Sequence, residues 1–143
     1  MTTTSIATFL SRLHEFHVEG VKVSYEKPPR SLQIDNLPAK FPRLPEKDDN
    51  ILTFQAYGGL PTLRCELVIA IEPFTEKLTA GNEFSPINFE KLVTMADNLN
   101  DALRTLKPGS LTEGPATWSI RQEQITVNGV DFWAIVAPIE GKG

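Results

Sequence analysis

The sequence predicts one α+β domain spanning residues 1–143, with a mostly antiparallel sheet of four to five strands and two helices packed on one face. Two segments repeat their apolar residues with the 3.6-residue period of a helix, and several others alternate with the period of two that is typical of a strand. Helices do not separate successive strands, as the crossovers of a parallel sheet would require, so antiparallel pairing is favoured.

Length and composition exclude several classes of protein. The 143 residues suffice for one ordinary domain, and 41% apolar with 22% charged residues is a globular mixture. A formal charge of -4 offers no basic surface for nucleic acid, and the single cysteine, Cys65, excludes an intrachain disulfide. Because the first residues also lack the apolar run of a signal peptide or membrane span, we expect a soluble cytosolic protein.

The N-terminal segment carries an apolar stripe that predicts a helix over residues 5–19. The stripe consists of Ile6, Phe9, Leu10, Leu13, Phe16 and His17. Thr4 or Ser5 can cap the start of this helix, and Gly20 can adopt the left-handed conformation that ends a helix. Alternating apolar residues then predict a short strand over 21–25.

A proline-rich segment follows, with five prolines among the 18 residues 28–45. Proline lacks an amide donor, so a continuous helix or a central strand is not expected here. We expect an extended arm laid along an edge of the sheet, with Leu37, Phe41 and Leu44 as apolar anchors. Together with the exposed loop that follows, this arm occupies residues 28–50.

The loop contains Asp48 and Asp49 at a solvated tip, and strand character returns at residues 51–57 and 63–74. In the longer strand one face carries Leu63, Cys65, Leu67, Ile69 and Ile71, and the other carries Arg64, Glu66, Val68 and Ala70. Apolar residues on both faces predict a central position in the sheet.

The second helix is predicted over residues 86–107, with Ser85 as its cap and Pro86 in its first position. Its apolar positions are Phe89, Leu92, Val93, Ala96, Leu99, Leu103 and Leu106. The remaining residues predict a hairpin in which strands 118–127 and 130–139 flank an Asn128–Gly129 type I′ turn. The turn pairs Val127 with Val130 and Ile125 with Phe132. Farther from the turn, the apolar residues of the second strand change to the other face, so a bulge or burial on both faces is expected near Ala134.

Residues with catalytic or metal-binding chemistry are few. His14 and His17 are three residues apart, whereas a helical zinc pair is usually four apart with a third ligand nearby. Cys65 lies on the core face of the predicted central strand, which favours a buried thiol over a nucleophile. No phosphate-binding glycine motif or G-x-S-x-G motif occurs. The sequence therefore predicts no enzymatic activity, no cofactor and no metal.

Four pieces of the chain carry a family resemblance. They are the N-terminal amphipathic helix, the segment LPAKFPRLP, the strand TLRCELVIAIEPF with the helix FEKLVTMADNLNDALRTL, and the closing ITVNGVDFWAIVAPIE. In this order they resemble the tail terminator and neck-completion proteins of long-tailed bacteriophages, and the closing hairpin is the piece most similar to that family.

The resemblance implies a structural protein of the virion neck, assembled in the host cytoplasm, with no active site. It implies a homo-hexameric ring that caps the head-proximal end of the tail tube, stops tube polymerisation and joins the tail tube protein to the head–tail connector. Genomic DNA would pass through the ring without specific binding, and no membrane would be involved. The residues expected at its interfaces are Leu37, Phe41, Leu44, Asp48, Asp49 and Trp133.

Two other interpretations stay open. The chain could be a small cytosolic αβ domain, ligand-binding or enzymatic, with a pocket between the sheet and the helices. It could also be an adaptor in a multiprotein complex unrelated to phage. Titratable residues converging on a core face would favour an enzyme, and the sequence does not show such a group.

Overall fold

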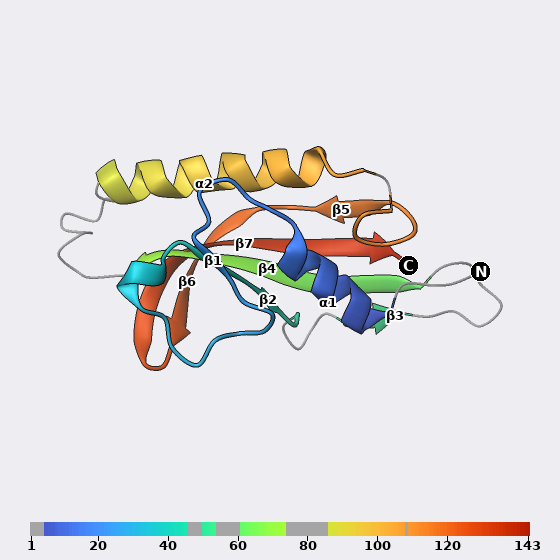
Figure 1. The fold of residues 1–143 in the computed structure, drawn as a ribbon, viewed down its shortest axis with the longest axis horizontal. Helices are drawn as coiled ribbons and strands as arrows, with labels where there is room; N and C mark the ends of the chain where they lie inside the picture. The colour runs from blue at the N-terminus through green and yellow to red at the C-terminus, as the bar shows by residue number, and fades with distance from the viewer. Residues whose placement is uncertain (1–4, 46–49, 54–60, 74–85, 108) are drawn as a thin grey trace.

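A computed structural model describes residues 5–45, 50–53, 61–73, 86–107 and 109–143. Within them lie two α-helices, one 3-10 helix and a single sheet of seven strands (Figure 1). The helices are α1 (Ile6–Glu15), η1 (Ile34–Asn36) and α2 (Pro86–Arg104). The strands are β1 (Val23–Ser24), β2 (Ala39–Arg43), β3 (Leu52–Thr53), β4 (Thr62–Pro73), β5 (Ala116–Trp118), β6 (Arg121–Val127) and β7 (Val130–Lys142). The predicted α+β class is confirmed.

The sheet is mixed and mostly antiparallel, in the order β1-β2-β4-β7-β5, with β3 also paired to β4 and β6 also paired to β7. Among the described strands only β1 and β2 run parallel. The strand count exceeds the predicted four to five for two reasons. The segment that forms β2 was not expected to be a strand, and Ser119 and Ile120 divide the predicted strand 118–127 into β5 and β6.

Both central strands, β4 and β7, are buried on two faces, as predicted for β4. On the helix face, which α1 and α2 cover, Leu67, Ile69, Ile135 and Ala137 pack with Phe9, Leu13, Leu92, Met95, Leu99 and Leu103. On the opposite face, called here the far face, Phe41, Val68, Ala70, Ile125, Phe132, Ala134 and Val136 form a second cluster under Tyr25, Leu32 and Leu37. The expected irregularity is present, but it lies in β4 between Ala70 and Glu72, opposite Trp133 and Ala134.

The proline-rich arm departs from the prediction. Residues 39–43 form β2, which lies inside the sheet between β1 and β4, so the expectation of an edge position is wrong. Pro42 lies beyond the last residue paired with β1, Lys40, and in the described part of the chain no strand borders β2 there. A proline is tolerated at such a position because a missing amide there breaks no pairing with an outer strand.

Helix α1 starts as predicted and ends earlier. The Ser5 hydroxyl accepts a hydrogen bond from the Thr8 amide at 3.1 Å, which is the expected cap. The predicted end near residue 19 is wrong, because the backbone becomes extended at Phe16 and the helix stops at Glu15. Gly20 does adopt a positive φ of 88°, but in the connection after the helix.

Lys40 of β2 satisfies the end of α1. Its Nζ donates hydrogen bonds to the carbonyl of Leu13 at 2.9 Å, to that of His14 at 3.2 Å and to that of Phe16. The same ammonium lies 4.2 Å from the centre of the Phe16 ring. The side chain is only 1% exposed, and burial lowers the pKa of Lys40 to about 8. A buried cation therefore joins the helix layer to the sheet at the negative end of the helix dipole.

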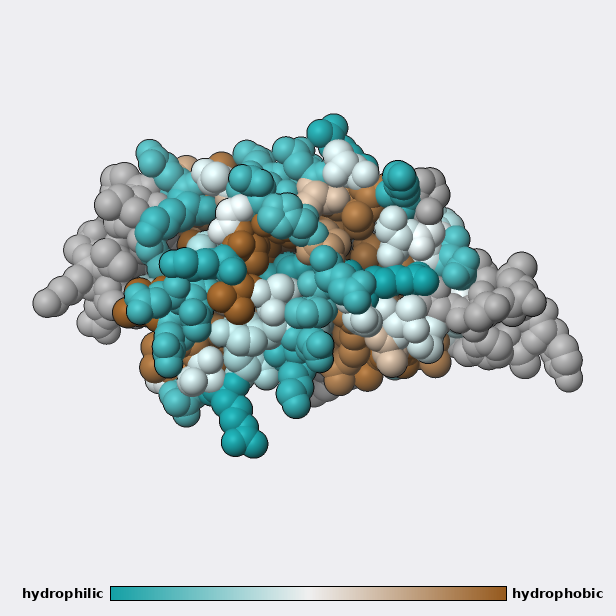
Figure 2. Space-filling view, viewed as in Figure 1, coloured by the Kyte–Doolittle hydropathy of each residue, from teal (hydrophilic) through white to brown (hydrophobic). Residues whose placement is uncertain are grey.

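The surface on the side shown in Figure 2 is mixed. Its hydrophobic areas are small and separated by hydrophilic side chains. Neither of the described α-helices combines the length and apolarity needed to cross a lipid bilayer. Helix α2 ends at Arg104, three residues before the predicted end, and its predicted cap, Ser85, lies outside the described residues.

The predicted hairpin with its Asn128–Gly129 turn is confirmed. Asn128 and Gly129 have φ values of 52° and 77°, the left-handed angles of a type I′ turn. A Cβ at Gly129 would contact nothing within 4 Å, so only the backbone conformation resists substitution. We expect Gly129→Val to lower the free energy of unfolding by about 1–3 kcal/mol. In urea denaturation the control Gly129→Asn should cost less, since asparagine tolerates these angles; equal losses would contradict the turn assignment.

Removing the Lys40 ammonium tests the helix cap. We expect Lys40→Met to lower the free energy of unfolding by about 1–3 kcal/mol at neutral pH, because buried carbonyl groups at the end of α1 lose their donor. Circular dichroism during chemical denaturation measures this loss. A variant as stable as the original protein would show that the hydrogen bonds contribute nothing net.

The original protein and Lys40→Met should also differ in how their free energy of unfolding depends on pH. The ordinary lysine pKa is 10.5 and that of folded Lys40 is about 8, so between these pH values the unfolded chain binds more protons than the folded one. The free energy of unfolding should therefore rise with pH across this window in the original protein, relative to Lys40→Met. A constant difference between the two proteins from pH 8 to pH 10.5 would contradict a lowered pKa.

Candidate functional site

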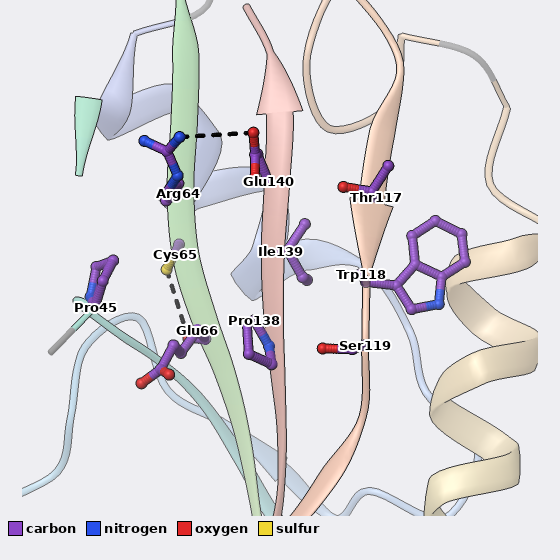
Figure 3. Close-up of a pocket in the computed structure, with 10 residues that line it drawn as sticks. All are labelled: Pro45, Arg64, Cys65, Glu66, Thr117, Trp118, Ser119, Pro138, Ile139 and Glu140. Carbon is purple, nitrogen blue, oxygen red and sulfur yellow. Dashed lines mark hydrogen bonds and ion pairs between the residues drawn. The ribbon is translucent and has the colours of Figure 1, made fainter. Parts of the chain in front are cut away.

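The far face is apolar at one end and polar at the other. Its polar part, called here the polar face, consists of Arg43, Thr62, Arg64, Glu66, Thr117, Arg121, Glu123, Pro138, Glu140 and Lys142. The alternation of strand residues places these side chains opposite the helices. An open groove of about 320 Å³ lies on this face between Arg64 and Ser119, and Figure 3 shows its lining residues.

Four charged residues form a closed ring on the polar face. Glu66 of β4 accepts a hydrogen bond from Arg43 Nε at 2.8 Å and one from Arg121 Nη2 at 3.0 Å. Glu123 of β6 accepts from Arg43 Nη1 at 2.8 Å and from Arg121 Nη2 at 2.9 Å. The charges alternate in sign around this ring, which therefore ties β2, β4 and β6 together across β7.

The pKa shifts of Arg43, Arg121 and Glu123 favour the charged forms of these three ring residues. Burial by itself lowers the pKa of Arg43 and of Arg121, but hydrogen bonds and charges from Glu66 and Glu123 outweigh burial and raise both. Burial likewise raises the pKa of Glu123, and the hydrogen bonds from the two arginines outweigh it, so this pKa lies below its ordinary value of 4.5. The ring thus stabilises the charged forms of Arg43, Arg121 and Glu123.

The other charged residues of the polar face also have partners within the chain. Arg64 lies 3.6 Å from Glu140 and donates to the Thr53 hydroxyl at 2.8 Å, and Lys142 donates to the Thr62 hydroxyl at 2.6 Å. In Figure 3 the Arg64 and Glu140 side chains reach toward each other across β4 and β7. Charges held by internal partners form a preorganised surface, which suits contact with another macromolecule.

The residues considered for catalysis or metal binding lie apart. Cys65 is buried, and burial raises the pKa of its thiol to about 12, so the nucleophilic thiolate is disfavoured at neutral pH. His14 Nδ1 is 3.1 Å from the Ser24 hydroxyl, and His17 lies 3.7 Å from Glu19. Within the described residues no three histidine, cysteine or acidic side chains are grouped to hold a metal ion.

The residues predicted for subunit contacts are not brought together. Phe41 and Trp133 are 4% and 7% exposed, because they pack into the chain's own two clusters, so they offer no contact surface in this conformation. Leu37 is half-buried on the far face. Leu44 is 50% exposed and remains available for contact. Asp48 and Asp49 lie outside the described residues.

Sequence reasoning missed the charged ring. A signal was present, since Arg64 and Glu66, like Arg121 and Glu123, are opposite charges two residues apart on one strand face. What the sequence does not reveal is that β7 pairs with β4 on one side and with β6 on the other, which brings these two pairs onto one surface.

Glu66→Gln tests the ring. The neutral amide loses the charge that pairs with two arginines at a nearly buried position, so the free energy of unfolding should fall by about 1–3 kcal/mol. The matched control is Glu140→Gln, whose carboxylate is 45% exposed and 3.6 Å from Arg64, and should cost about 0–1 kcal/mol. Equal losses would show that the ring has no special contribution.

Acid should weaken the ring through Glu123. The pKa of this residue is lowered by folding, so its contribution to stability is present above the unfolded value of 4.5 and is lost as pH falls through the folded value. A Glu123→Gln protein should therefore lose less stability than the original protein on acidification below about pH 4.5. Parallel pH profiles for the two proteins would contradict the lowered pKa.

Comparison with known proteins adds no identification. Neither a scan against protein-family models nor a search of curated proteins finds a match to this chain.

Proposed function

We propose that this chain is a virion structural protein of a long-tailed bacteriophage, which caps the head-proximal end of the tail tube as a homo-hexameric ring. The ring stops tube polymerisation and joins the tail tube protein to the head–tail connector. It acts by matching the symmetry of the tube, with one surface of each subunit meeting a different surface of the next.

The observation that carries the proposal is the closing hairpin. Residues 125–140 form the piece that most resembles the terminator family, and they lie in the hairpin of β6 and β7, whose second strand is buried on both faces. The two helices on one side of a mostly antiparallel sheet are also the architecture expected at the outset.

The charge of the polar face indicates whether this surface could line a DNA passage in the proposed ring. Its charged side chains are Arg43, Arg64, Arg121 and Lys142 against Glu66, Glu123 and Glu140. This face therefore has a small positive excess, and the rest of the chain is more acidic than the overall charge of -4. A passage that repels DNA needs a negative lining, so in the proposed ring another surface lines the lumen.

The test combines the purified protein with purified tail tubes. We expect electron microscopy to show one sixfold ring at the head-proximal end of each tube and tube growth to stop. Binding along the tube wall, or a copy number other than six, would overturn the proposal. Because the free protein is free to remain monomeric until a tube provides the template, light scattering of the protein alone is not the deciding measurement.

A substitution of Leu44 tests whether this side chain contributes to tube capping. We expect Leu44→Ser to reduce capping of tubes without changing the free energy of unfolding, because this side chain is half exposed. The matched control is Ile34→Ser, another exposed apolar side chain, on η1, which should cap normally. Phe41→Ala would not serve, since truncating a core phenylalanine destabilises by about 3–5 kcal/mol.

One observation favours the alternative of a ligand-binding domain. A hollow of about 500 Å³ beside the end of α2 is lined by apolar residues such as Leu106 and Trp118 together with polar ones, among them Arg104 and Lys107. Its size is within the range of small-molecule sites. The tube-binding assay separates the two proposals, since a ligand-binding domain has no reason to bind the end of a tube.

A further inference from the structure

On the side of β7 away from β4, the edge of the sheet is formed by β5 and β6, and among the described strands β6 has an unpaired side. Strand β6 pairs with β7 on one side, and no described strand pairs with it on the other. Such an edge presents a row of hydrogen-bonding groups to which another strand can add.

The hairpin geometry identifies which residues present those groups. The type I′ turn joins Val127 to Val130 by a hydrogen bond, and in an antiparallel pair hydrogen-bonded and non-hydrogen-bonded residues alternate. The amide and carbonyl groups of Gln122, Gln124 and Thr126 therefore point away from β7, toward the open side.

Within the described residues, the β6 edge lacks several of the devices by which proteins usually protect an open strand. Residues 121–127 include no proline and no lysine, and their register with β7 is regular. The charges of Arg121 and Glu123 are held in the ring on the far face. Gln124 and Thr126 bond with Asp131 of β7, so their side chains lie over the sheet and leave the backbone accessible.

An apolar groove of about 240 Å³ lies beside this edge on the helix face. Val93 and Ala96 of α2 line it from above, and Ile120, Gln122 and Ile135 line it from the sheet. Val93 is 45% exposed although it belongs to the apolar stripe of α2. A strand placed about 4.8 Å beyond β6 would direct every second side chain to the side of this groove.

We propose that the β6 edge and the α2–β6 groove together form a strand-addition site, which binds an extended segment of another polypeptide. The groove calls for apolar side chains at every second position of that segment. The charges of the edge itself, Arg121, Glu123 and Asp131, already have partners in the chain, so the segment is uncharged over the paired residues. This site does not depend on the proposed ring, because it follows from the groove and from a strand edge that no described strand occupies.

The test uses the full chain, labelled with nitrogen-15, and an acetylated, amidated peptide of alternating threonine and valine with one lysine at each end. We expect saturable changes in the amide signals of Gln122, Gln124 and Thr126, and slower hydrogen exchange at these three amides. Gln124→Pro should weaken binding about tenfold or more, because it removes an outward donor that no described residue uses. The matched control Gln124→Thr keeps that donor and should bind normally.

Two further measurements test the strand-addition site even if Gln124→Pro does not fold. A peptide methylated on alternate backbone nitrogens retains its valines but loses hydrogen bonds, so it should bind much more weakly. Val93→Ser should weaken the original peptide and leave a valine-free, all-threonine peptide unaffected. Equal binding of the methylated peptide, or signal changes located elsewhere, would overturn the site. Self-association that Gln124→Pro abolishes would overturn the assigned occupant in favour of a second copy of this chain.

Discussion

Strands β4 and β7 pair along nearly their whole length, and over their central residues both faces of this pair are buried. A strand pair in this position must be apolar in both phases and must be covered on both sides. Helices α1 and α2 cover one side, and the segment between Tyr25 and Leu37 covers part of the other. Where that cover ends, the far face changes from apolar to charged. The arrangement of the other elements thus follows from the needs of these two strands.

Lys40 shows how the layers are joined where apolar contact alone does not suffice. Helix α1 has ten residues, too few to be stable in isolation, and only Phe9 and Leu13 within it are fully buried. The buried Lys40 ammonium donates hydrogen bonds to carbonyl groups at the end of α1, and these bonds fix the position of the helix end relative to β2. The cost is desolvation of the ammonium, which its lowered pKa reflects.

Local patterns predicted the elements whose causes are local. The Asn128–Gly129 turn, the double-sided apolar strand β4 and the start of α2 at Pro86 all follow from neighbouring residues. The end of α1 did not, because its donor, Lys40, comes from a strand far along the chain. Strand β2 was missed because the prolines of this segment outweighed the short alternation of Ala39 and Phe41 with Lys40. The charged ring was missed because it depends on which strands pair with β7.

The charged ring also has a consequence for how the sheet finds its alignment. Side chains alternate between faces, so a shift of β6 by one residue along β7 would move Arg121 and Glu123 to the helix face, into the exposed row of Gln122 and Gln124, and would separate them from Glu66 and Arg43. A shift of β2 by one residue along β4 would move Arg43 to the helix face as well, where Lys40 and Pro42 are buried. The misaligned β2 would therefore bury an unpaired charge, which costs far more than the loss of a surface ion pair. The ring therefore makes misaligned pairings of β2 and β6 less stable than the native pairings. It helps to set the register of these two strands, which apolar residues alone would define poorly.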